Sequence, residues 1–252
     1  MVKRTKLRLQ IVSNSLNIST IGTIHSPYKE KFAIPRQPSL VPAAKAIVEI
    51  PFEYCPKESL NGIEQYSHLW LIFCFHATQQ QGWKPLVRPP RLGGNEKLGV
   101  LATRSTFRPN PIGMSVVKFE KVTYSATSTL LHVSGIDLLD KTPILDIKPY
   151  LPYVDSIEQA QAGFAQHAPE TPIKVTFSEQ AQQTIAQQSQ AKQLTELISQ
   201  VLAQDPRPAY KKNKADDKVY GMRLHNFNIR WQFTQLDEIT VLELELEQDI
   251  HE

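Results

Sequence analysis

The feature that most restricts the fold of this chain is a succession of short strand-like runs in its first 150 residues, separated by proline, glycine and polar residues. The runs are rich in β-branched and aromatic side chains, and they lie at residues 18–25, 46–50, 68–76, 98–103, 114–124, 130–139 and 144–148. The run HLWLIFCFH at 68–76 is apolar without alternation, which predicts a strand buried on both faces. The crossover helices that a parallel sheet needs are not visible between the runs. The pattern therefore predicts a β-barrel or sandwich over residues 18–157.

The pattern changes in the last third of the chain. Residues 158–172 contain few large apolar side chains and two prolines, which is typical of a linker. A strand is expected at 173–177, Ser178 is a candidate N-cap, and the strands at 219–235, which is long enough to bend, and 239–246 complete a sheet. A helix is indicated by apolar residues at helical spacing, namely Leu194, Leu197, Ile198, Val201 and Leu202, and Asp205-Pro206 is expected to end it. We predict a smaller α+β domain over residues 173–252.

Composition excludes several classes of protein. The chain has 252 residues and a net charge of +3, so any contact with nucleic acid depends on local patches. The two cysteines, Cys55 and Cys74, lack the spacing of a zinc site or a disulfide scaffold, and no apolar run is long enough for a membrane span. There is no GxGxxG, and Gly94-x4-Gly99 is followed by valine where a P-loop needs lysine. Residues 1–17 are basic without a secretory apolar stretch, so we expect an N-terminal extension on a cytoplasmic protein.

Two proline-rich stretches combine rigid backbone with polar side chains. Pro35 and Pro38 bracket Arg36 and Gln37, which suits either ligand contact or a structural turn. The stretch TRSTFRPNPIG at 103–113 contains Arg104, whose planar fork suits a carboxylate or phosphate. Its Pro-Asn-Pro sequence restrains Asn110, and this cluster has no evident core role. We favour a functional site here over a solvated turn.

Acidic and basic stretches give two further candidates. In DLLDKTPILDIKPY, Asp146 and Lys148 are expected on one face of a strand, whereas Asp137 and Asp140 flank a turn where aspartate is common for local hydrogen bonding. Residues 207–218 hold five Lys/Arg against two aspartates, next to Tyr210 and Tyr220. Phosphate neutralisation and stacking are what an RNA contact needs, although many such runs are merely solvated loops. A second basic stretch carries Lys84, Arg88, Arg91 and Lys97.

Together these blocks resemble one family. IGTIHSPYKEKFAIPRQP, GIEQYSHLWLIFCFH, RPPRLGG, LATRSTFRPNPIGMS, DLLDKTPILDIKPYLPY and AQDPRPAYKK are similar to the TsaA/TrmO family of tRNA adenine N6-methyltransferases, from about residue 19 to 231. The resemblance implies an antiparallel β-barrel that binds S-adenosylmethionine in place of a Rossmann fold. It implies methyl transfer to N6 of N6-threonylcarbamoyladenosine at position 37 of threonine tRNA, beside the anticodon. It further implies a homodimer, and a C-terminal domain that helps to hold the tRNA.

The resemblance also assigns residues by matched motif. The implied cofactor-binding residues are Pro35, Arg36, Gln37, His76, Ala77, Arg104, Met114, Ile136, Asp137, Leu138 and Leu139. In our interpretation Arg104 or Arg36 pairs with the methionine carboxylate, and Asp137 or Asp140 faces the ribose hydroxyls or the sulfonium. Asn110 is our candidate for orienting the modified base. The expected tRNA-binding residues are Arg207, Tyr210, Lys211, Lys212, Arg223 and Arg230.

Two other functions compete with this interpretation. A non-catalytic RNA-binding barrel would bind tRNA without cofactor and would not need the Pro-Asn-Pro cluster. A hydrolase acting on the cofactor lacks support, because no nucleophile elbow, metal triad or paired-carboxylate signature is present. No metal is expected, since the seven histidines lack HxH or HExxH spacing.

Overall fold

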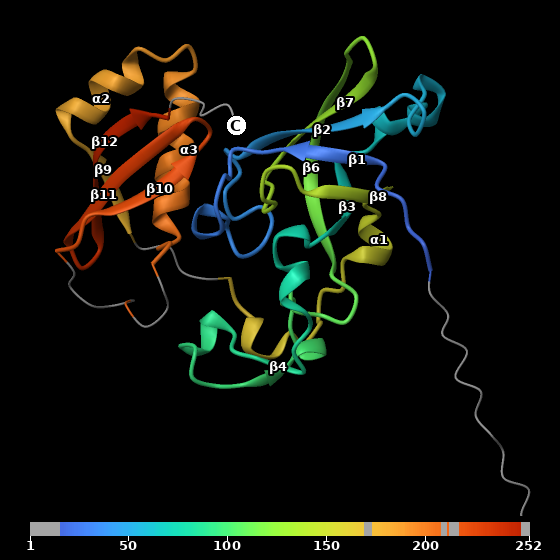
Figure 1. Cartoon of the computed structure of the whole chain (residues 1–252), viewed down its shortest axis with the longest axis horizontal. Helices are drawn as coiled ribbons and strands as arrows, with labels where there is room; N and C mark the ends of the chain where they lie inside the picture. The colour runs from blue at the N-terminus through green and yellow to red at the C-terminus, as the bar shows by residue number, and fades with distance from the viewer. Residues whose placement is uncertain (1–15, 169–172, 208–210, 212–216, 248–252) are drawn as a thin grey trace, which may run out of the picture.

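The first part of the chain is a closed antiparallel barrel. The computed structural model describes residues 16–168, 173–207, 211 and 217–247. Six strands form the barrel in the order β1-β2-β7-β6-β3-β8, with every neighbouring pair antiparallel (Figure 1). They are β1 (Gly22–His25), β2 (Lys45–Pro51), β3 (His68–Cys74), β6 (Ile112–Tyr124), β7 (Ser128–Ser134) and β8 (Pro143–Pro149). The prediction of a mainly β, antiparallel, barrel-like architecture is confirmed.

Short elements fill the connections of the barrel. A two-stranded sheet pairs β4 (Leu86–Val87) with β5 (Leu98–Gly99). The short helices are η1 (Lys31–Ala33), η2 (Lys57–Leu60), η3 (Ile63–Gln65), η4 (His76–Gln81), η5 (Pro90–Leu92), η6 (Val100–Ala102), α1 (Pro152–Asp155) and η7 (Gly163–Ala165). The predicted strand at 98–103 is wrong, because the chain leaves β5 after two residues and turns into η6. The run at 130–139 is likewise strand only as far as Ser134.

Strand β3 also corrects the expectation of burial on both faces. Its burial alternates, with Leu69, Leu71 and Phe73 pointing into the core and the intervening residues half-buried. The outer face is apolar because the segment after β8 covers part of it. There the indole N–H of Trp70 donates to Asp155 Oδ2 at 3.0 Å, and its ring lies 6.0 Å from that of Tyr150.

The second part of the chain is a four-stranded sheet packed on two helices, with strand order β10-β11-β12-β9. Its elements are β9 (Lys174–Phe177), α2 (Glu179–Ala186), α3 (Ala191–Ala203), β10 (Tyr220–Leu224), β11 (Phe227–Gln235) and β12 (Glu238–Leu246). Ser178 caps α2 as predicted, because its side chain accepts the N–H of Ala181 at 3.1 Å. The five apolar residues predicted for a helix all lie buried on α3. The predicted single strand at 219–235 is instead a hairpin, because His225 turns the chain with φ 52°.

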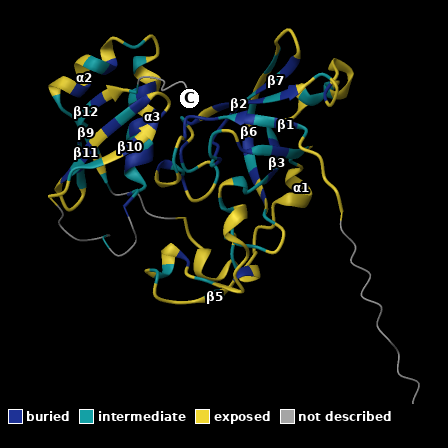
Figure 2. Cartoon of the chain, in the orientation of Figure 1, coloured by how far each residue is buried: buried dark blue, intermediate teal, exposed yellow. Residues whose placement is uncertain are grey.

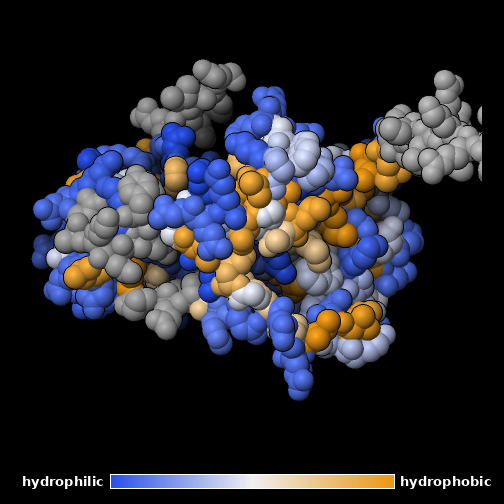
Figure 3. Space-filling model, turned by 90° about the horizontal axis from the view of Figure 1, so that it is seen from below, coloured by the Kyte–Doolittle hydropathy of each residue, from blue (hydrophilic) through white to orange (hydrophobic). Residues whose placement is uncertain are grey.

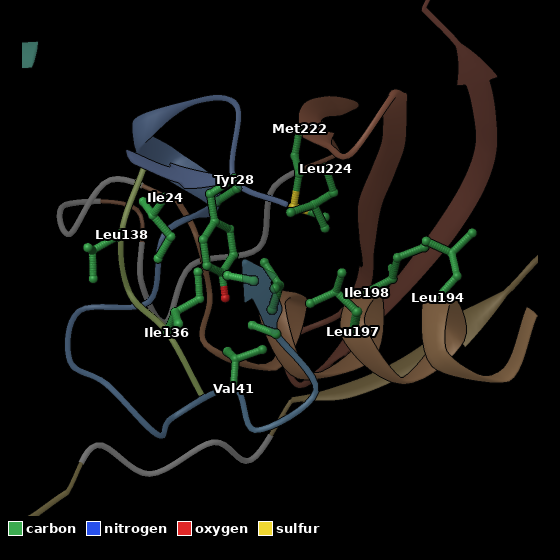
Figure 4. Packing of buried hydrophobic residues seen from close by; sticks show 14 of the residues in the cluster. Ile24, Tyr28, Val41, Ile136, Leu138, Leu194, Leu197, Ile198, Met222 and Leu224 are labelled. Atoms are coloured by element: carbon green, nitrogen blue, oxygen red, sulfur yellow. The ribbon is translucent and has the colours of Figure 1, made fainter. Parts of the chain in front are cut away.

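The two parts share one hydrophobic core. Figure 4 shows Tyr28 and Ile24 from the barrel packed beside Leu224 and Met222 from the second sheet. Backbone contacts join the same regions: Tyr28 bridges to Leu224, and the N–H of His225 donates to Pro27 O at 2.8 Å. The loop after β1 therefore lies between the barrel and the second sheet (Figures 1 and 2). Within the described residues, no helix is both long and apolar enough to be a membrane span.

Candidate active site

A large cavity opens between one end of the barrel and the second part of the chain. Its volume is about 1200 Å³, which exceeds the roughly 300–1,000 Å³ of most small-molecule sites. The loops after β1 and β3, the loop before β6 with the start of that strand, and the turn after β7 supply most of its wall. The last turn of α3 and the residues after it, as far as Arg207, supply another part. The site is therefore completed by both parts of the same chain.

The cavity brings together ten of the eleven predicted cofactor-binding residues. The lining includes Pro35, Arg36, Gln37, His76, Ala77, Arg104, Met114, Asp137, Leu138 and Leu139. Ile136 does not line the cavity, because its side chain is fully buried in the core behind the turn. Asn110 is exposed and lies outside the lining. Residues from four separate stretches of sequence thus converge on one space.

Two arginines place positive charge in the wall. Arg104 Nη1 donates to Gln37 Oε1 at 2.7 Å, which links the TRSTF stretch to the Pro-Arg-Gln-Pro loop. Burial lowers the pKa of Arg36; the charge of Asp205 opposes this shift, and that of Arg91 adds to it. Both guanidinium groups belong to the lining, so the cavity is suited to a carboxylate or phosphate.

Asp137 is one of three acidic residues that line the cavity, together with Glu30 and Asp205. Ser115 Oγ donates to Asp137 Oδ1 at 2.5 Å. Burial raises the pKa of Asp137 to about 6, although the Ser115 hydroxyl, its own backbone N–H and the charge of Arg104 favour the ionised form. The backbone N–H groups of Leu138 and Leu139 form no hydrogen bond within the described part of the chain, so they are free to donate to a ligand. This turn therefore offers a carboxylate and two donors.

The structure gives different roles to Asp137 and Asp140, which the sequence left as equivalent candidates. Asp140 does not line the cavity; its Oδ1 accepts the N–H of Ser26 at 2.9 Å and its Oδ2 accepts from Lys29 Nζ at 2.6 Å. Asp146 and Lys148, which were expected on one face of a strand, form an ion pair on the exposed side of β8, with Lys148 Nζ 2.8 Å from Asp146 Oδ2. Asp140 thus fixes the loop after β1, and only Asp137 faces the cavity.

The proline-rich loop at 103–113 is held in place by backbone contacts. Arg108 Nη1 donates to the carbonyl oxygens of Thr103 at 2.9 Å and Ser105 at 3.3 Å. The N–H of Phe75 donates to Pro111 O at 2.7 Å. Gly113 lies so close to Phe73 that an added Cβ would stand 2.4 Å from its ring. These contacts fix the loop that carries Asn110 beside the cavity.

Arg207 corrects part of the predicted tRNA surface. Its guanidinium is buried, donates to Asp205 Oδ1 at 2.9 Å and Oδ2 at 3.0 Å, and lies 3.5 Å from the ring centroid of Phe233. A side chain in these contacts is not at the surface to neutralise phosphate. Both Asp205 and Arg207 line the cavity, so Arg207 instead shapes the wall that the second part contributes.

The remaining predicted tRNA contacts are spread over the second part. Arg223 Nε lies 2.5 Å from Glu247, and Arg230 Nη1 lies 3.1 Å from Glu243, on the outer face of the sheet. Lys211 Nζ donates to the hydroxyl of Tyr220 at 2.9 Å. Tyr210 and Lys212 lie outside the described residues.

Sequence reasoning missed several polar residues of the lining, and two of them, Ser115 and Asp205, act on Asp137 and Arg36. Ser115 is buried on β6, where Gly113, Ser115 and Val117 point inward; a serine at an inward position of a strand was the available signal. Asp205 was interpreted as a helix stop, and its left-handed φ of 49° fits that role. Its contact with the cavity depends on packing between the two parts, which no local pattern reveals.

The fold and site define a class of protein with a β-barrel, a second sheet and, between them, a cavity large enough for a small ligand. The chain has neither the Rossmann nor the P-loop glycine motif. Comparison with known proteins assigns the family. The sequence model of the tRNA-methyltransferase O N-terminal domain matches residues 23–156, and that of the TrmO C-terminal domain matches residues 170–247. The chain belongs to the tRNA-methyltransferase O (TrmO) family.

Relatives and solved structures agree with this assignment. The chain is 49% identical over 222 residues to the tRNA (adenine(37)-N6)-methyltransferase of Escherichia coli K12, covering 88% of this chain and 94% of that protein. It is 48% identical to a putative S-adenosylmethionine-dependent methyltransferase, RcsF, of Pseudomonas aeruginosa, covering 90% and 97%. The crystal structure of TrmO from Pseudomonas aeruginosa superposes with a TM-score of 0.76 at 41% identity, covering 92% and 99%.

Proposed function

We propose that this protein is an S-adenosylmethionine-dependent methyltransferase acting on N6 of adenine-37 in tRNA. The observation that carries the proposal is the convergence of ten motif residues from four stretches on one cavity. Its relatives are named as enzymes of this reaction and as users of this cofactor. The volume of about 1200 Å³ leaves space for a nucleotide beside the cofactor.

The residues of the wall fit the cofactor by chemistry. When bound, S-adenosylmethionine supplies an electrophilic methyl group on a sulfonium centre. Arg104, oriented by Gln37, is the residue that would pair with the methionine carboxylate, and Arg36 is its alternative partner. Asp137 offers a carboxylate to the ribose hydroxyls or to the sulfonium charge, and the free N–H groups of Leu138 and Leu139 offer donors to the adenine edge.

The substrate nucleotide is proposed to be N6-threonylcarbamoyladenosine in threonine tRNA, and the product its N6-methyl derivative. Threonylcarbamoylation adds a carboxylate, so the ligands together present two carboxylates to a cavity that holds Arg36 and Arg104 in its wall. Position 37 lies in a single-stranded loop, so little stacking is lost when the base enters the site. The chain must hold nitrogen, methyl and sulfur in line at roughly 3–3.5 Å.

Asn110 is proposed to orient the modified base. It stands outside the lining on the rigid loop at 103–113, where a bound anticodon loop would approach. We expect Asn110→Ala to lower kcat while leaving the cofactor Kd nearly unchanged. Steady-state kinetics with calorimetry tests this, and equal losses in both would refute the role.

The active form is proposed to be a cytoplasmic homodimer. Large apolar side chains remain exposed on β6, around it and after β8, notably Leu101, Ile112, Met114, Tyr153 and Ile157. Met114 also lines the cavity, so a second subunit covering β6 would lie close to the cofactor.

The test is transfer of labelled methyl to purified threonine tRNA, with carbamoylated and uncarbamoylated tRNA compared side by side. Label on the carbamoylated tRNA alone supports the full proposal. Label on both supports the methyltransferase and contradicts recognition of the carbamoyl group. Cofactor binding without transfer contradicts this acceptor, and tRNA binding without cofactor binding supports the non-catalytic RNA-binding alternative.

A further inference from the structure

A strongly basic segment borders the cavity, and the site described above uses only part of it. We define the basic lobe as residues 83–108, which include β4, η5, β5 and η6. It holds six Lys/Arg residues and one acidic residue, Glu96, whereas the whole chain has a net charge of only +3. The six are Lys84, Arg88, Arg91, Lys97, Arg104 and Arg108. Positive charge is therefore concentrated in about a tenth of the chain.

None of these six side chains lies within ion-pair distance of a carboxylate in the described part of the chain, although the charge of Arg104 acts on Asp137 across the cavity wall. Lys84 Nζ lies 4.5 Å from the ring centroid of Phe107, and Arg91 Nη2 donates to the carbonyl of His167 at 2.7 Å. Arg88 and Lys97 are exposed and have no polar partner within the described part of the chain. The charges of Lys84, Arg88, Arg91 and Lys97 are thus available to an external anion.

The second sheet, which the sequence favoured as the tRNA surface, differs in this respect. Its exposed arginines Arg223 and Arg230 pair with Glu247 and Glu243, which flank Glu245 at the C-terminal end of β12. A phosphate approaching them must compete with these carboxylates and is repelled by the row of glutamates. The basic lobe has no such row.

The basic lobe also carries surface suited to bases and reaches the cavity. Trp83 is 57% exposed beside Lys84, and exposed aromatic rings next to cations are what single-stranded RNA contacts use. Arg91, Arg104 and Arg108 belong to both the basic lobe and the cavity lining. Figure 3, which views the molecule from the side of β4, shows hydrophilic surface interrupted by apolar patches on this face.

We propose that the basic lobe, and not the second sheet, is the main phosphate-binding surface for the anticodon arm, with Trp83 stacking on an unpaired base. The inference rests on the proposed function, since it names the surface that delivers tRNA to that site. Lys84, Arg88 and Lys97 lie outside the cavity lining and bind backbone phosphates. Arg91 continues this surface into the cavity.

The test measures the Kd for purified threonine tRNA at several salt concentrations. The triple variant K84A/R88A/K97A is compared with K45A/K121A/K192A, which removes the same charge from exposed lysines elsewhere, and with R223A/R230A. At about 0.1 M salt we expect the basic-lobe variant to weaken binding by about tenfold or more, with the slope of log Kd against log salt reduced by about 2–3. Trp83→Ala is expected to raise the Kd by about fivefold or more with little change in slope.

Separate readouts distinguish the possible failures. Cofactor binding by calorimetry should be unchanged in the basic-lobe variant. If wild-type protein methylates tRNA but the basic-lobe variant binds it as tightly, or R223A/R230A carries the loss, the proposal is overturned while the proposed function stands. If the wild type binds tRNA without methylating it, the proposed function fails instead, and the variants still identify the RNA surface. A basic-lobe variant that changes oligomeric state in light scattering would make this face a subunit contact and overturn the proposal.

Discussion

Replacing Asp137 with asparagine should stabilise the ligand-free protein at neutral pH and remove part of its pH dependence. Burial raises the pKa of this carboxyl from 3.8 to about 6, so the folded protein holds the proton more tightly than the unfolded chain does. Below pH 3.8 the carboxyl is protonated in both states and does not lower the free energy of unfolding. That free energy falls as the pH rises from 3.8 to about 6, and above about 6 it stays lower by a constant amount. Asparagine has no charge to bury and can still accept from Ser115.

The magnitude follows from the pKa. The rise from 3.8 to about 6 corresponds to about 3 kcal/mol of lost stability at pH 7. Because the carboxyl is half-buried and opens onto a cavity, solvent reduces this value. We expect Asp137→Asn to gain roughly 1–3 kcal/mol at pH 7, or roughly 2–12 °C in Tm for a chain of this size, and almost nothing near pH 4. The same change should weaken cofactor binding, a typical exchange of function for stability.

Urea denaturation of the ligand-free protein between pH 4 and 8 measures the effect. Asp140→Asn is the matched control, because burial of Asp140 is outweighed by Lys29 and the Ser26 N–H, which together lower its pKa. The ionised Asp140 carboxylate stabilises the fold, so Asp140→Asn should have a lower free energy of unfolding than the wild type at pH 7. The difference should shrink as the pH falls. Equal stability of wild type and Asp137→Asn at pH 7, or a gain that is the same at pH 4, would refute the reasoning.

Three further changes test the packing around the site. Gly113→Ala puts a methyl group 2.4 Å from the Phe73 ring and should destabilise by about 1–3 kcal/mol in urea denaturation; an unchanged midpoint would contradict this close approach. Ser178→Ala removes both the cap of α2 and the hydroxyl that donates to Leu242 O, and should cost about 1–2 kcal/mol, whereas Ser178→Thr keeps a hydroxyl for both contacts and should largely retain stability. Arg207→Ala leaves Asp205 buried without its guanidinium and should cost about 3 kcal/mol or more; a loss confined to tRNA binding would instead restore Arg207 to the RNA surface.

Local patterns predicted the elements whose formation depends on local forces. The periodic apolar face of α3 and the cap at Ser178 are set by residues within a few positions, and both are confirmed. The hairpin at 220–235 was missed because the left-handed residue at the turn is His225, not the glycine or asparagine that marks most such turns. The prediction of a strand at 98–103 was wrong because only Leu98 and Gly99 pair, in the short sheet with β4, and the apolar residues that follow form η6.

The family resemblance named ten of the barrel residues that line the cavity, but it did not predict the wall that the second part of the chain contributes. Asp205 and Arg207 belong to that wall. Arg207 lies over the ring of Phe233 on β11 and pairs with Asp205, whose charge acts in turn on the pKa of Arg36. This arrangement exists only because the two parts share a core, with Tyr28 bridging to Leu224. The second part of the chain is therefore a wall of the site in the same subunit, and its contribution cannot be reduced to an RNA-holding surface.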